Sequence, residues 1–282
     1  MKQFNSNVIW LLLPFFCIFI ACSDKDTKDP VPTSPYRILN ETLATDQLGV
    51  GFRENDIALG LEIQTLFEEL IADGTAKSIS LKWFGEDILL TNQPFLKQST
   101  ALPDDNSLSA LLERGKFIVG GLIYPPMFIW QGVDYSGFDI EIANGVAKKL
   151  GVELVIKPII WDNKYNELNN GNIDCIWSAT CITPERIDSM FFAKAYANNR
   201  VVIIVKQNSS IKNINHLEGK KVGVIKGSSH FGIVQSHPIY PKIQSLLEFS
   251  TSPDLIASLR TGVIDAMIID EVLAKFYVNT IF

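Results

Sequence analysis

The sequence predicts an α/β fold, and two observations lead to this prediction. From residue 117 onward, short and nearly continuous apolar runs alternate with amphipathic stretches. Such runs are typical of buried parallel strands, and their alternation with helices is typical of sheets whose ligand sites lie at the strand carboxyl ends. The expected strands are 117–124, 153–160, 173–179, 200–206, 220–225 and 264–270.

Two stretches between these runs are expected to form helices. In 138–150, apolar residues recur at three- and four-residue spacing, and Gly151 ends the pattern. The second helix, 254–261, follows Ser252 and Pro253, which we interpret as its cap and its first helical position.

The part of the chain before residue 106 contains similar elements. QLGVGF (47–52) is expected to be a strand, and 56–73 is expected to be a helix with its apolar residues on one face. Residues 86–105 have no clear period, so we interpret them as a connector.

Composition excludes several classes of protein. The chain has 282 residues, of which 47% are apolar and 20% charged, so wholesale disorder is excluded. Its net charge is 25 − 31 = −6 without blocks of Lys or Arg, which argues against nucleic acid as a partner. Three His and four Cys leave little material for a metal centre, and we expect no cofactor.

The first 21 residues are interpreted as a targeting signal. Val8 to Ala21 is an apolar run interrupted by Pro14, which is too short to span a bilayer and fits a signal-peptide hydrophobic region. The run ends at Ala21-Cys22, which resembles the bacterial lipobox, in which the cysteine becomes the acylated first residue. We therefore expect residues 1–21 to be a lipoprotein signal peptide and Cys22 to anchor the protein to a membrane of the cell envelope, facing the periplasm or exterior.

Residues 22–35 are polar and contain prolines, so they are expected to be an extended tether. With Cys17 removed and Cys22 lipidated, Cys175 and Cys181 remain in the folded part. They could pair in an oxidising compartment, but a disulfide framework would need more cysteines. Cys175 lies in an apolar stretch and is expected to be a small buried hydrophobe.

A set of motifs between residues 115 and 270 resembles the bacterial extracytoplasmic solute-binding proteins, family 3, which serve polar amino-acid ABC transporters. The resemblance implies a two-lobed hinge fold of the periplasmic-binding-protein type (type II) and binding of a free amino acid for delivery to a transporter permease. The motifs are, in order, GKFIVGGLIYPPMF, SGFDIEIANGVAKKLG, WDNKYNELNNGNIDCIWSATCITPERIDSMFF, GKKVGVIKGSSH and IDAMIID.

The order of the segments departs from the family pattern. Residues 43–85 resemble the extreme C-terminal segment of the family, yet here they precede the family's start at 106–120. We therefore expect a circularly permuted domain in a monomer, because loop closure over the connector is cheap. A domain swap between two molecules remains the rival interpretation. The expected parts are the permuted segment 36–85, the connector 86–105, lobe 1 (106–199 with 41–85), lobe 2 (200–282), and hinge strands near 196–200 and 36–42.

One end of the expected ligand site is predicted from Thr183, Pro184 and Arg186. Thr is a good helix cap, Pro suits the first helical position, and Arg186 then falls in the first turn. Helix amides and a forked guanidinium would converge there on one anion. The alternative is that Arg186 pairs with a surface carboxylate. The resemblance implies that Arg186 binds the ligand's carboxylate.

Asp270 predicts the other end, because it follows an apolar strand at the carboxyl edge of a sheet. A buried carboxylate needs a cationic ligand or an internal partner. The resemblance implies contact with the ligand's amino group, and the alternative is that Asp270 caps a helix over 271–277.

Two turns after strands are expected to add polar contacts. The resemblance implies that Ser178, Ala179 and Cys181 offer backbone groups and a side chain to the ligand, although the family often has Gly and a hydroxyl residue or Met at the last two positions. Ser228 and Ser229 would donate to the carboxylate from lobe 2, or cap a helix.

Tyr124 and Trp161 match the aromatic positions that sandwich the ligand side chain in the family, although packing in the core is the alternative. Family members often carry an Asp where this chain has Gly121, which weakens the case for a ligand with a cationic side chain. His230 and His237 lack a third ligand, so we expect two solvated histidines and no metal site.

Two other function classes remain open. The fold is shared with a cyclohexadienyl dehydratase, but no clear general acid other than Asp270 and Glu271 is found, and no catalytic motif. A ligand-sensing module without transport is the third class. We expect a binding protein and not an enzyme.

Overall fold

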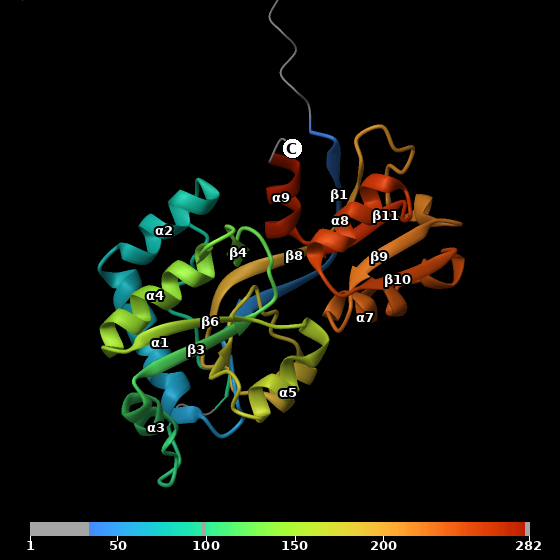
Figure 1. Cartoon of the computed structure of the whole chain (residues 1–282). Helices are drawn as coiled ribbons and strands as arrows, with labels where there is room; N and C mark the ends of the chain where they lie inside the picture. Colours follow the sequence, from blue (N-terminus) through green and yellow to red (C-terminus); the bar gives the residue numbers. More distant parts are fainter. Residues whose placement is uncertain (1–33, 98–99, 280–282) are drawn as a thin grey trace, which may run out of the picture. The chain divides into compact units, whose positions relative to one another are not determined.

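The computed structural model describes residues 34–97 and 100–279. The expected signal peptide, Cys22 and tether residues up to 33 lie outside the described residues. The described part has two main sheets with helices around them, which confirms the predicted α/β fold class (Figure 1).

The first sheet has four strands in the order β2-β7-β3-β6, and we call the part built on it lobe 1. β3 pairs in parallel with β6 and β7, while β2 pairs antiparallel with β7. Helix α1 packs against α4, α2 and α3. The elements are β2 (Gly51–Phe52), α1 (Ile57–Ala72), α2 (Thr75–Phe84), α3 (Ser107–Arg114), β3 (Lys116–Gly121), β4 (Ile129–Trp130), β5 (Tyr135–Ser136), α4 (Phe138–Leu150), β6 (Glu153–Pro158), η1 (Trp161–Asn163), α5 (Lys164–Asn169), β7 (Cys175–Ile176) and α6 (Pro184–Ser189).

The second sheet has five strands in the order β1-β8-β11-β9-β10, and we call the part built on it lobe 2. Helix α8 contacts four of these strands, and α9 contacts β8, β1 and β11. The elements are β1 (Tyr36–Gly49), β8 (Ala195–Lys206), η2 (Ile214–Leu217), β9 (Lys221–Ile225), α7 (Ser229–Ser236), η3 (Tyr240–Lys242), β10 (Ser245–Phe249), α8 (Ser252–Thr261), β11 (Ala266–Asp270) and α9 (Glu271–Asn279).

The expectation that the apolar runs are parallel strands is wrong for β8. This strand pairs antiparallel with both β1 and β11, whereas β9 pairs in parallel with β10 and β11. Alternate residues of β8 enter two different hydrophobic clusters, with Val201 and Ile203 in one and Val202 and Ile204 in the other. Burial on both faces therefore explains the continuous apolar run without parallel pairing.

Helix α4 has the predicted bounds, and Gly151 ends it in the left-handed conformation with φ 72°. For α8, the assigned cap is wrong by one residue: Thr251 is the N-cap, and its side chain accepts a hydrogen bond from the Asp254 amide. The predicted strand 173–179 is only two residues long as β7. The predicted strand 47–52 is divided between the end of β1 and β2. Helices α2, α3 and α5 and strands β4, β5 and β10 were not expected.

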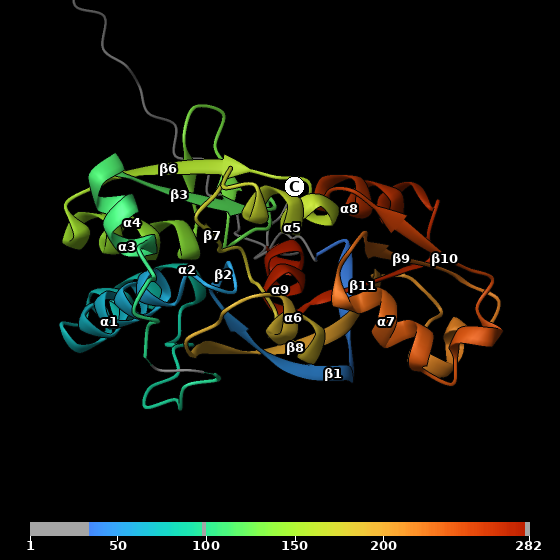
Figure 2. The same ribbon diagram turned by 90° about the horizontal axis from the view of Figure 1, so that it is seen from below.

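Strands β1 and β8 join the two lobes. They lie side by side along most of their length (Figures 1 and 2), with pairs from Tyr36–Lys206 to Gly49–Ala195. Directly after β1 the chain enters lobe 1 at β2, and β8 begins where the chain leaves lobe 1. Both connections between the lobes thus run through one antiparallel pair.

The connector has no helix or strand over 86–105 in its described residues, but it is held against α1 and against the residues around the start of β8. Leu90 and Leu96 donate backbone hydrogen bonds to the carbonyls of Tyr196 and Ala193. Asp105 accepts from the Ala58 amide at the start of α1, 2.6 Å away. Among residues 34–97 and 100–279, no helix is long and apolar enough to cross a bilayer.

Candidate functional site

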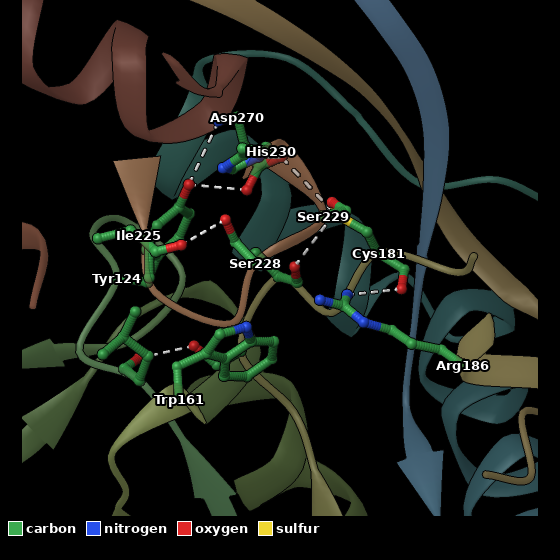
Figure 3. Close-up of a pocket in the computed structure, with 12 residues that line it drawn as sticks. Tyr124, Trp161, Cys181, Arg186, Ile225, Ser228, Ser229, His230 and Asp270 are labelled. Atoms are coloured by element: carbon green, nitrogen blue, oxygen red, sulfur yellow. Dashed lines mark hydrogen bonds and ion pairs between the residues drawn. The ribbon is translucent and has the colours of Figure 1, made fainter. Parts of the chain in front are cut away.

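A small cavity lies between the two lobes, and residues of both lobes line it (Figure 3). All nine residues that the sequence analysis assigned to a ligand site line this cavity. Three further lining residues were not assigned: Leu122, Ile225 and His230. The nine are Tyr124, Trp161, Ser178, Ala179, Cys181, Arg186, Ser228, Ser229 and Asp270.

Arg186 lies in α6 and is held at the cavity from lobe 1. Thr183 caps the helix, its hydroxyl accepting a hydrogen bond from the Arg186 amide at 3.3 Å, as predicted. The side chain is 4% exposed, donates through Nη1 to the Cys181 carbonyl at 2.8 Å, and lies 5.3 Å from the Trp161 ring centre. No carboxylate of the described residues lies within ion-pair distance of it, so the alternative of a surface ion pair is wrong. Among residues 34–97 and 100–279, Arg186 is thus a buried cation without a carboxylate partner.

Asp270 ends β11 and is 4% exposed, and several donors surround its carboxylate. Oδ2 accepts from the Tyr124 hydroxyl at 2.7 Å. Oδ1 accepts from the Asn199 amide at 2.6 Å and lies 3.1 Å from His230 Nε2. Burial acts to raise the pKa of Asp270, but His230, Tyr124 and Asn199 outweigh it and hold the pKa below its ordinary value.

The expectation that His230 is solvated is wrong, because this side chain is 2% exposed and faces Asp270. Figure 3 shows His230 next to Asp270, while Arg186 lies nearer to Cys181. His230 follows the two assigned serines directly in the chain, and this adjacency was the available signal. Asn199 was also missed; its amide bridges Asp270 and Asp46 of β1, 2.7 Å away.

The turn after β7 is held in place by a hydrogen bond to the buried carboxylate of Asp139. Ala179 has a left-handed backbone with φ 47°, which is unfavourable for a residue with a side chain. Its amide donates to Asp139 Oδ2 at 2.8 Å, and the Tyr196 hydroxyl donates to Asp139 Oδ1 at 2.9 Å. Asp139 is fully buried, and burial raises its pKa to about 7. Asp139 thus connects α4, the cavity turn and strand β8.

The two serines at the start of α7 differ in their contacts. Ser228 is the N-cap residue, yet its hydroxyl donates to the Ile225 carbonyl at 2.6 Å and makes no side-chain cap bond. Within the described residues, Ser229 Oγ and His230 Nδ1 are buried atoms without a hydrogen-bond partner. Since both residues line the cavity, these atoms are suited to a polar ligand.

The aromatic residues assigned to the ligand are buried, with Tyr124 4% and Trp161 5% exposed. Trp161 also lies against Lys164, whose Nζ is 5.2 Å from the ring centre and donates to the Gly227 carbonyl at 3.0 Å. Burial, together with the nearby charge of Arg186, lowers the pKa of Lys164 to about 8. Lys164 therefore forms part of a contact between the lobes.

Three other contacts join the lobes around the cavity. The Tyr124 hydroxyl reaches Asp270, the Ser252 hydroxyl donates to the Ile123 carbonyl at 2.8 Å, and Lys226 pairs with Asp162 at 2.9 Å. The lobes are thus in contact through several separate pairs of residues.

Cys175 and Cys181 are both buried and free, which confirms Cys175 as a small buried residue. Burial and then Asp270 raise the pKa of the Cys181 thiol well above its usual value. Among the residues described, no group of three or more His, Cys, Asp or Glu side chains is arranged to hold a metal ion. The charged groups available to a ligand in this small cavity are therefore one buried cation and one buried anion.

The family model of the bacterial extracellular solute-binding proteins, family 3, matches residues 118–277, more than half of the chain. The L-cystine-binding protein TcyJ of Escherichia coli (strain K12) is 32% identical over 176 residues, which cover 61% of this chain and 65% of that protein. The arginine-binding extracellular protein ArtP of Bacillus subtilis (strain 168) is 30% identical over 181 residues, covering 63% and 69%.

Among solved structures, a substrate-binding protein of an ABC uptake transporter from Streptococcus pneumoniae, with bound histidine, superimposes with a TM-score of 0.60. It is 29% identical and covers 63% of this chain and 74% of that one. The chain therefore spans about two thirds to three quarters of these relatives, and 65% of the length of TcyJ. This chain belongs to the bacterial extracellular solute-binding proteins, family 3.

Proposed function

We propose that this protein binds a free amino acid, or a similar small zwitterion, outside the cytoplasm and delivers it to an ABC transporter. The observation that carries the proposal is Arg186, a guanidinium that lines the cavity, is 4% exposed and has no carboxylate partner among the described residues. An isolated buried cation is unfavourable, so a ligand carboxylate would supply the missing counter-charge. The forked guanidinium suits such a group.

The remaining lining residues suit the other end of an amino acid. Asp270 is an anion that the ligand's ammonium can approach, and Ser229 Oγ and His230 Nδ1 have no partner within the described residues. Ser178 and the Ala179 turn belong to lobe 1, whereas Ser228, Ser229 and Asp270 belong to lobe 2. The ligand would seat first on lobe 1 through Arg186, and lobe 2 would then close over it by bending near 196–200 and 36–42.

We also propose that the chain is a circular permutant that closes on itself, which would make the protein a monomer. In support, the family match starts at residue 118, yet β1, β2 and α1, which lie outside it, pack into the same two lobes. Helix α9, where the match ends, contacts β1 (Figure 1). The parts would be 36–85, the connector 86–105, lobe 1 at 106–199 and lobe 2 at 200–282.

We further propose that Cys22 is lipidated, that the protein lies in the cell envelope and that its partner is a transporter permease. The lipobox-like Ala21-Cys22 supports the anchor, and the family description supports a location outside the cytoplasm. The named relatives are binding proteins, which supports binding without turnover over a dehydratase activity.

The test is calorimetry on the purified soluble part after a thermal-shift screen against the standard amino acids. We expect one or a few amino acids to bind and to be recovered unchanged, which also separates binding from dehydratase turnover. In Arg186→Ala the affinity should fall about a hundredfold or more, because the ligand carboxylate loses its buried partner.

The matched control is Arg260→Ala, which removes the same charge from an exposed position and should leave the affinity unchanged. If Arg186→Ala binds as tightly as the unmodified protein, the assigned role of Arg186 is wrong. If no amino acid binds to the folded protein, the proposed function is wrong.

A further inference from the structure

The charges that line the cavity are few and balanced. Of the twelve lining residues, Arg186 and Asp270 carry a formal charge, and the imidazole of His230 already faces Asp270 at 3.1 Å. The backbone of a free amino acid brings one carboxylate and one ammonium. These two groups would match Arg186 and Asp270, so a charged side chain on the ligand would find no opposite charge left among the lining residues.

Charged groups behind the cavity wall are bonded to other partners and do not line the cavity. Asp46 accepts from Asn199, and Asp139 accepts from the Ala179 amide and the Tyr196 hydroxyl. Lys164 donates to the Gly227 carbonyl. These groups complete the structure of the wall and offer no free counter-charge.

The backbone also excludes an acidic side chain at Gly121, which lies next to the lining residue Leu122. A Cβ atom there would come within 2.5 Å of Ser178 Cβ and 2.8 Å of Phe128 Cδ1. Phe128 is itself fully buried, so it cannot move aside easily. The space that a carboxylate would need at this position is filled.

The rest of the wall carries no charge, and apart from Ser178, Ser228 and Ser229 it is mostly apolar or aromatic. Leu122, Ile225 and Trp161 are among its lining residues. Placing an unpaired charge against such groups is strongly unfavourable.

We propose that the cavity selects amino acids whose side chains carry no charge and rejects those with a cationic or anionic side chain. This inference rests on the proposed function and specifies its substrate class. It also excludes a ligand with a second zwitterionic head, because the cavity lining holds one unpaired cation and one anion.

The experiment is calorimetry with pairs of ligands that match in shape and differ in charge: citrulline with arginine, glutamine with glutamate, and norleucine with lysine. We expect the neutral member to bind at least about a hundredfold more tightly in every pair for which binding is measurable. If a charged member binds as tightly as its neutral counterpart, the inference is overturned and the proposed function stands. If neither member of any pair nor any standard amino acid binds, both are overturned.

A substitution tests the same inference in the opposite direction. Leu122→Asp adds a carboxylate to the wall, and it should reduce the preference for citrulline over arginine at least tenfold. Leu122→Asn is the matched control of equal size without charge, and it should keep the original preference. An unchanged preference in a folded Leu122→Asp protein would contradict the inference, and the comparison of ligand pairs on the unmodified protein does not depend on this variant.

Discussion

Arg186 and Asp270 both line the cavity and both are 4% exposed, but their surroundings differ. Asp270 accepts hydrogen bonds from Tyr124 and Asn199 and faces His230. Arg186 has no carboxylate partner among the described residues. The Asp270 end is therefore largely complete within the protein, whereas the Arg186 end needs a ligand.

This difference separates stability from binding. Groups that are satisfied internally stabilise the folded protein without a ligand, while an uncompensated buried charge stabilises only the complex. Variants at Asp270 should therefore mainly lower the free energy of unfolding, whereas variants at Arg186 should mainly lower the affinity for the ligand.

The largest expected effect on stability is that of Asp270→Asn. The substitution keeps the size of the side chain, but it removes the charge and replaces one of the two accepting oxygens with an NH2 donor that faces another buried donor. We expect the free energy of unfolding of the ligand-free protein to fall by about 3 kcal/mol. Urea denaturation measures this, with Arg186→Ala as the comparison, which should change the same quantity by less than about 1 kcal/mol because its charge is unpaired. Equal losses in the two variants would contradict the contrast.

A second buried carboxylate, Asp139, sharpens the comparison through pH. Burial raises its pKa to about 7, whereas Asp270 is held below its ordinary pKa. A carboxyl with a raised folded-state pKa stabilises the protein at low pH, and that stability is lost as the pH rises toward 7. We expect the unmodified protein to lose about 2 kcal/mol of this contribution between pH 5 and pH 7.

Asp139→Asn is the variant that tests this, because an amide does not titrate and can still bond to Ala179 and Tyr196. Between pH 5 and pH 7, the free energy of unfolding of Asp139→Asn, measured by denaturation, should fall by about 2 kcal/mol less than that of the unmodified protein. Asp270 does not interfere, since its contribution is lost only below about pH 4. Parallel pH profiles of the two proteins would show that Asp139 does not titrate in this range.

The smallest effect concerns the contact between the lobes at Lys226 and Asp162. Their charged groups are 2.9 Å apart and about half exposed, so the pair is expected to contribute about 0.2–1 kcal/mol. Lys226→Ala should weaken the binding of the amino acid by less than about fivefold, and the effect should shrink at high salt.

The control is Lys116→Ala, which removes a comparable exposed pair with Glu153 inside lobe 1, 3.6 Å apart. It should leave the affinity unchanged, because both partners lie on neighbouring strands of one sheet. If both variants weaken binding equally, the pair at Lys226 has no special part in holding the lobes together.

Much of the fold follows from local patterns. The three- and four-residue spacing and Gly151 predict the bounds of α4, and Thr183 with Pro184 predicts the start of α6. The direction of β8 was predicted wrongly, because a run buried on both faces looks the same in parallel and antiparallel pairing. The one-residue error at α8 arises because Thr251 and Ser252 are both suitable caps.

The site was predicted in its residue types, but the contacts among them were not. His230 and Asn199 have no distinctive spacing, and their roles depend on Asp270, which is 40 and 71 residues away. Asp139 was not predicted because an acidic residue in the first turn of a helix is usually explained by its interaction with the positive end of the helix dipole.

By itself, the sequence determined the α/β class, the main helices and the residue types around the cavity, because spacing, capping and apolar runs act locally. Only the tertiary structure decided which charge is paired. Asp270 is hydrogen-bonded within the protein because β8, α7 and lobe 1 bring polar groups to it across the cavity, and Arg186 is left without an ion pair because no element brings a described carboxylate there. The balance of charge in a cavity depends on which distant segments meet, and no local pattern encodes that.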